Sequence, residues 1–104
     1  MDRMTMLKEI LAANPGDSFA RYGLAMEYSN AGEFETSLAE FATLLKNTPD
    51  YTPGYFMAAQ TLAKASRVDE ARKIWSALAK DDESGASAEA RVRLGELEAK
   101  AGQG

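Results

Sequence analysis

Two consecutive stretches of equal length decide the fold: residues 18–51 read SFARYGLAMEYSNAGEFETSLAEFATLLKNTPDY, and residues 52–85 read TPGYFMAAQTLAKASRVDEARKIWSALAKDDESG. Aligned without a gap, they match large apolar and small residues, with Ala25 over Ala59 and Phe41 over Trp75. Self-similarity at a fixed period of this size is the signature of a repeat architecture. We therefore predict two repeat units, at 18–51 and 52–85, and call the offset from residue 18 to residue 52 one repeat length.

Each unit is predicted to contain two helices, because apolar residues recur at three- and four-residue spacing on both sides of a polar interruption. In the first unit the interruption contains Gly32, which can adopt the left-handed backbone that ends a helix. In the second unit we expect Thr52 to cap the first helix and Pro53 to occupy its first turn. Ser66 is expected to open the second helix through a variant of the capping box.

The ends of the chain are predicted to be half-units. Residues 2–14 form an N-terminal helix, residues 86–101 a C-terminal capping helix, and residues 102–104 a frayed tail. Strand-like alternation is sustained nowhere in the sequence. The expected fold class is therefore all-α, with about six helices in a single domain over residues 1–104.

The composition excludes most catalytic and metal chemistry. The chain has no cysteine and no histidine, which removes thiolate nucleophiles, histidine bases, Ser-His-Asp triads and zinc fingers. Asp81-Asp82-Glu83 is a carboxylate cluster, but contiguous residues do not form an opposed acid–base pair or a spaced calcium loop. We therefore expect no enzyme, no catalytic residue, no cofactor and no metal.

Charge and hydropathy limit the partners. The net charge is −4, so no global basic field favours nucleic acid. Residues 51–80 carry five basic and two acidic residues, which we interpret as a solvated outer helix face, with an acidic partner as the alternative. No apolar run approaches the roughly 20 residues that span a bilayer, and the N-terminus is charged, unlike a signal peptide. We expect a cytoplasmic protein without membrane contact.

The motifs of the two units resemble those of the tetratricopeptide repeat (TPR), W-x2-L-G-x2-Y, then A-x3-F, then P. The first unit reads Arg21-x2-Leu24-Ala25-x2-Tyr28, then Ser37-x3-Phe41, then Pro49. The second reads Tyr55-x2-Ala58-Ala59-x2-Leu62, then Ala71-x3-Trp75, with Glu83 in place of the proline. The departures are Arg21 at the tryptophan position and Ser37 at an alanine position. The chain is thus similar to a short bacterial-type TPR protein.

This resemblance implies a right-handed superhelical α-solenoid of about two full units plus flanking capping helices, because a helix pair cannot bury its apolar face alone. It also implies a non-enzymatic module that binds a helix or peptide of another protein on its concave face, lined by the first helix of each unit. Carried over residue by residue, that face holds Phe19, Tyr22, Met26, Ser29, Asn30, Pro53, Phe56, Gln60, Ala63 and Lys64.

Two alternatives remain open. The terminal helices could cover the aromatic residues, with the N-terminal helix over Phe19, and these residues would then belong to the core. The second alternative is a structural module that self-associates into a homodimer. The open ends of the stack would then join two copies through Met4, Leu7, Val92 or Leu97.

Overall fold

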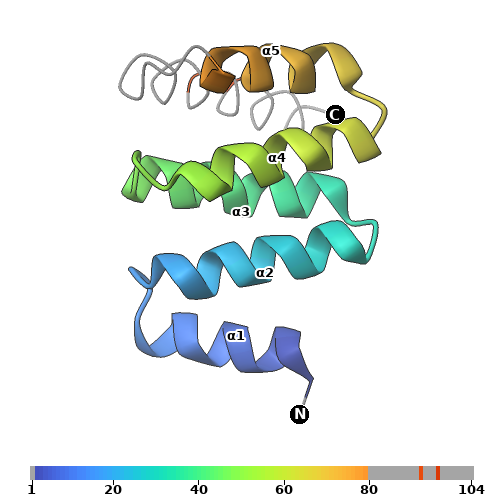
Figure 1. The fold of residues 1–104 in the computed structure, drawn as a ribbon. Helices are drawn as coiled ribbons and strands as arrows, with labels where there is room; N and C mark the ends of the chain where they lie inside the picture. The colour runs from blue at the N-terminus through green and yellow to red at the C-terminus, as the bar shows by residue number, and fades with distance from the viewer. Residues whose placement is uncertain (1, 80–91, 93–95, 97–104) are drawn as a thin grey trace.

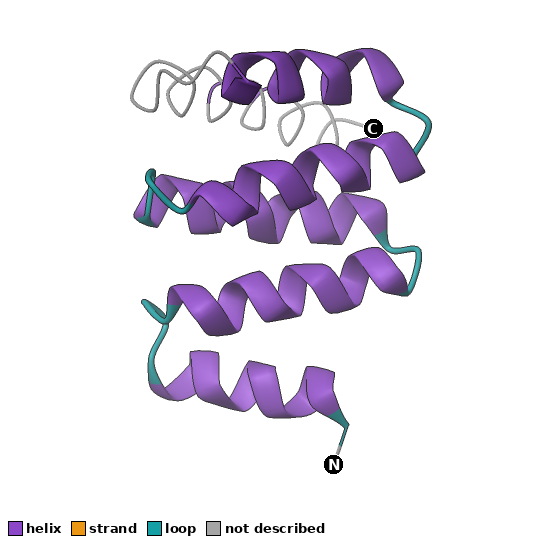
Figure 2. Ribbon diagram, in the orientation of Figure 1, coloured by secondary structure: helices purple, strands orange, loops and turns teal. Residues whose placement is uncertain are grey.

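Five consecutive α-helices make up the described part of the chain. The computed structural model describes residues 2–79, 92 and 96. The helices are α1 (Arg3–Ala13), α2 (Ser18–Asn30), α3 (Phe34–Asn47), α4 (Thr52–Lys64) and α5 (Val68–Ala79). Among these residues there is no strand (Figure 2), which confirms the all-α prediction for this part. Apart from Val92 and Glu96, the predicted helix over 86–101 lies outside the described residues, as do the carboxylate cluster and the tail.

Each helix packs on the next one along the chain, so the described helices form a stack from α1 to α5 (Figure 1). Helix α2 also contacts α4. The short connections reverse the chain direction each time. As a result, the helix ends line up along two edges of the stack. The N-terminal ends of α2 and α4 and the C-terminal end of α1 lie along the same edge, on the left in Figure 1.

The helix boundaries repeat with the period of the sequence. Helix α4 begins and ends one repeat length after α2, and α5 begins one repeat length after α3. Helix α1 ends one repeat length before the end of α3. The end of α1 therefore corresponds to the end of α3 in the period of the sequence.

The turn inside each unit has the same geometry twice. Gly32 and Ser66 have positive φ angles of 80° and 67°. The N–H of the following residue donates to the carbonyl five residues back, at 2.9 Å after α2 and 2.8 Å after α4. A left-handed residue enclosed by this hydrogen bond is the Schellman motif, which satisfies the last free carbonyls of a helix. The role predicted for Gly32 is confirmed.

Two predicted helix starts in the second unit are wrong. Ser66 does not open α5, because its left-handed backbone places it directly beyond the end of α4. Thr52 is the first residue of α4 and the N-cap is Tyr51, so the Thr52 hydroxyl donates to the Asp50 carbonyl instead, at 3.4 Å. The expected position of Pro53 in the first turn is confirmed. Apolar spacing fixes a helix to within a turn, but not which neighbouring polar residue caps it.

We expect Ser66→Gly to raise the free energy of unfolding by about 0.5–1 kcal/mol. Left-handed backbone costs a residue with a Cβ roughly 1–2 kcal/mol, and glycine removes this cost. Part of the gain is lost because glycine also increases the conformational entropy of the unfolded chain. Urea denaturation followed by circular dichroism measures the difference. The reciprocal variant Gly32→Ser is the control and should lose a similar amount. If both variants were as stable as the parent, the turn assignment would be contradicted.

The core consists of two clusters of buried residues along the stack. Its main cluster joins α2 to α5 and contains the fully buried large residues Phe41, Leu45, Tyr55, Leu62 and Ile74. Ala25 and Ala59, which the alignment of the two units matches, are both fully buried. A second cluster joins α1 to α2 through Leu7, Leu11, Ala20 and Leu24. The side chain of Trp75, which the alignment matches to Phe41, lies outside the described residues.

Hydrogen bonds accommodate the two departures from the repeat motif. The Arg21 guanidinium donates to the Pro15 carbonyl at 3.2 Å, and the Tyr55 hydroxyl donates to the Pro49 carbonyl at 2.5 Å. These two donors lie one repeat length apart, as do the two prolines. Ser37 is fully buried, and its hydroxyl donates to a backbone carbonyl of α2 at 2.7 Å. Arg21 and Ser37, the two departures from the motif, therefore have hydrogen-bond partners at their positions.

Candidate protein-interaction site

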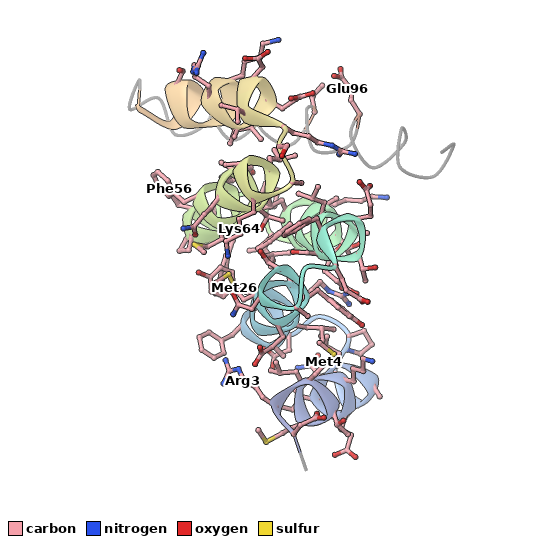
Figure 3. The ribbon with its side chains drawn as sticks, turned by 90° about the vertical axis from the view of Figure 1, so that its right-hand side faces the viewer. Arg3, Met4, Met26, Phe56, Lys64 and Glu96 are labelled. Carbon is pink, nitrogen blue, oxygen red and sulfur yellow. The ribbon has the colours of Figure 1, made fainter. Side chains whose placement is uncertain are left out.

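The predicted residues of α2 and α4 gather on one side of the stack. Met26, Phe56 and Lys64 lie on this side in Figure 3. Phe19 precedes Met26 by about two helical turns, so it shares the same face of α2. Gln60 lies midway between Phe56 and Lys64 at four-residue spacing, on the same face of α4, and is exposed.

Two aromatic rings on this side are open to solvent. Phe19 is 71% exposed and Phe56 is 46% exposed. The alternative in which the N-terminal helix covers Phe19 is therefore wrong, because α1 packs on α2 through Leu7 and Leu11 instead. Helix α1 covers Ala20 in the first turn of α2 but leaves Phe19 in solvent.

Tyr22 belongs both to this side and to the core. It is half-buried, with its ring 6.3 Å from that of Phe41 and 5.5 Å from that of Tyr51. Burial of the phenol raises the pKa of Tyr51 above its usual value of 10.0, and the neighbouring Tyr22 and Asp17 raise it further. The sequence analysis missed Tyr51, because it falls in the joint between units and no pattern marks it as packed.

Ser29 is not part of the accessible surface, contrary to its predicted place in the binding face. It is 4% exposed, and its hydroxyl lies 2.9 Å from that of Thr61, linking α2 to α4. Since the Thr61 hydroxyl donates to the Met57 carbonyl at 2.8 Å, Ser29 is the donor in the pair. Asn30, the last residue of α2, is exposed beside it.

Helix α1 extends this side in a way the sequence analysis missed. Arg3 lies on the same side as Met26 and Phe56 (Figure 3), with its Nε 3.1 Å from Oε1 of Glu27. Ile10 follows Arg3 by two turns and therefore lies on the same face of α1, and it is exposed. Met6, between them, is also exposed. We call the surface of Met6, Ile10, Phe19, Tyr22, Met26 and Phe56 the apolar face.

The residues predicted for self-association are placed differently. Leu7 is buried against α2 and is therefore not free to meet a second copy, whereas Met4 is half-buried against the same cluster (Figure 3). Val92 is exposed, and Leu97 lies outside the described residues. The self-association hypothesis is therefore wrong for Leu7.

Other features of the described chain offer little to a small ligand. A notch of about 130 Å³ lies where α1 turns into α2, lined by Pro15, Gly16, Asp17, Ser18, Arg21, Leu44 and Asn47. Within this notch Arg21 is already paired with Glu40, with Nη1 of Arg21 2.6 Å from Oε1 of Glu40. Over the described positions, no three potential ligand residues could hold a metal ion together, and no helix is long and apolar enough to cross a bilayer.

Comparison with models of known families, with curated proteins and with solved structures finds no match to this chain. The TPR resemblance therefore depends on the motifs quoted above.

Proposed function

We propose that the protein is a non-enzymatic interaction module built from two TPR-like units in a right-handed superhelical stack. It binds a helix or peptide of another protein across the apolar face. The observation that carries this proposal is the exposure of Phe19 and Phe56 on one side of the stack. Burying a phenylalanine is worth roughly 1.5–3 kcal/mol, and aromatic residues and methionine are enriched in interfaces.

The repeat assignment has its own support. Helix boundaries, left-handed turn residues and side-chain hydrogen bonds to a proline carbonyl all recur one repeat length apart. A stack in which each element contacts mainly its neighbours is the arrangement typical of repeat proteins. Such stacks bind along an extended surface rather than in a closed pocket.

A homodimer through α1 is the weaker candidate. Helix α1 has 11 residues and is therefore about 16 Å long and about 10 Å wide. A dimer of two copies packed through α1 would bury a total surface area on the order of 600 Å² at most. Stable interfaces bury roughly 1,200–2,000 Å². The apolar face draws on three helices and offers a partner considerably more area.

We expect the double variant Phe19→Ala/Phe56→Ala to recover at least about tenfold less partner protein in affinity capture from the native cell. Truncating a central aromatic residue of an interface typically costs about 2 kcal/mol or more. Quantitative mass spectrometry of the captured proteins measures the loss. Tyr22 is left unchanged, because its contact with Phe41 would mix binding with stability.

Val68→Ala is the matched control. Val68 is 49% exposed but lies on α5, away from the apolar face. Its variant should capture the same proteins as the parent, and all variants should show the parent's circular dichroism spectrum. Equal recovery by the double variant and the parent would overturn the proposed function.

A further inference from the structure

We propose that the apolar face receives a single amphipathic α-helix laid across α1, α2 and α4, with acidic residues on its flank toward Lys64 and basic residues on the opposite flank. This inference rests on the proposed function and deepens it. It specifies the class of partner segment and a rule for the direction in which that segment binds.

The spacing of the apolar anchors favours a helix over a β-strand. Ile10, Phe19 and Phe56 lie on three helices of the stack, each in the half nearest the N-terminal ends of α2 and α4. Packed helices lie about 8–10 Å apart, which matches the roughly 10.5 Å rise of seven residues of an α-helix. Residues at i, i+7 and i+14 of one helix point the same way and therefore reach all three anchors. In a β-strand, residues about 10 Å apart are three positions apart and point to opposite sides.

The charges on either side of these anchors have opposite sign. Asp17 and Asp50 precede α2 and α4, at the edge of the stack nearer to Phe19 and Phe56. Lys64, the last residue of α4, lies at the opposite edge, where it is exposed and on the same side as Phe56 (Figure 3). Within the described part of the chain it has no ion-pair partner, whereas Arg3 at the same end is paired with Glu27. Across α2 and α4 the charge thus changes from negative to positive, whereas α1 contributes the exposed carboxylate of Asp2 next to the paired Arg3.

This polarity determines how a helix can lie. A helix with one acidic and one basic flank matches the two ends in one direction only, because turning it around exchanges its flanks. The charge pattern of the partner therefore sets whether its N-terminus lies over α1 or over α4. The attraction involves exposed charges and is consequently sensitive to salt.

Binding of two synthetic peptides tests the inference. Both are about 15 residues long, fluorescently labelled, and carry the same leucine stripe at heptad spacing. The bipolar peptide has one acidic and one basic flank, and the second peptide has two basic flanks. At about 50 mM NaCl we expect the protein to prefer the bipolar peptide about fivefold, and at about 1 M NaCl the preference should vanish.

Variants of the protein and of the peptide provide the controls. Lys64→Glu should reverse the preference, whereas Lys73→Glu, at an exposed position of α5, should leave it unchanged. A proline in the middle of the bipolar peptide should abolish binding, because it breaks an α-helix but suits a polyproline conformation. A photo-crosslinker at the peptide N-terminus should label α1 or α4, and exchanging the two flanks should move the label to the other helix.

Equal affinity for the two peptides, unchanged binding of the proline peptide or failure of both peptides to bind would overturn the inference. The proposed function is tested separately. If cellular capture still depends on Phe19 and Phe56 in any of these cases, the interaction module stands and only the bipolar helix is wrong. If capture does not depend on them either, both proposals are wrong.

Discussion

Phe41→Ala is expected to lower the free energy of unfolding by about 3–5 kcal/mol, whereas Phe19→Ala should change it by less than about 0.5 kcal/mol. Both changes remove the same atoms. Phe41 is 0% exposed in the main core cluster, so its removal leaves a cavity among α2, α3 and α4. Phe19 lies in solvent at the start of α2, so its removal leaves none.

Guanidinium denaturation followed by circular dichroism measures both values. A chain of this length typically has about 5–15 kcal/mol of stability, so the loss in Phe41→Ala is a large share of the total. The comparison also separates the core from the apolar face, since a residue of the face must be dispensable for folding. Similar losses in the two variants would contradict the placement of Phe19 in solvent.

Ala59→Glu is expected to lower the free energy of unfolding by about 4 kcal/mol or more. Ala59 is fully buried in α4, so a glutamate there has no room and no partner for its charge. The next residue, Gln60, is exposed, and Gln60→Glu is the matched control.

The two variants place the same new side chain one residue apart on the same helix, and in each the change in helix propensity is below about 0.7 kcal/mol. Gln60→Glu should stay within about 0.5 kcal/mol of the parent. Thermal melting of both variants beside the parent is a sufficient measurement. A parent-like melting temperature for Ala59→Glu would mean that α4 is turned differently from the structure described above.

The helices were predictable because the spacing of apolar residues directly reflects which side of a helix is buried. Helix α3 ends at Asn47, immediately before Thr48-Pro49, and α1 ends at Ala13, close to its predicted end. Ser66 was assigned to the wrong helix, because left-handed backbone is expected at glycine and serine is more often an N-cap. Only the hydrogen bonds of the turn reveal its actual role.

The candidate site was only partly predictable for a different reason. Spacing places Phe19, Met26 and Phe56 on shared helix faces, but it does not show what covers those faces. Ser29 has the right spacing and is nevertheless buried, because α4 brings the Thr61 hydroxyl against it. Ile10 was overlooked because the face that α1 presents depends on how it packs on α2, which is a tertiary property.

The neighbour-by-neighbour packing of the stack has a consequence for folding. Most contacts join segments close in sequence, which is the condition for fast folding and for opening in small cooperative units. Among the described helices α1 packs on α2 alone, so a single neighbour holds it when this end of the stack opens. A bound segment that bridges α1, α2 and α4 would tie these units together and slow amide hydrogen exchange first of all in α1. The bound segment would then stabilise the stack against local opening, as an additional packed helix would.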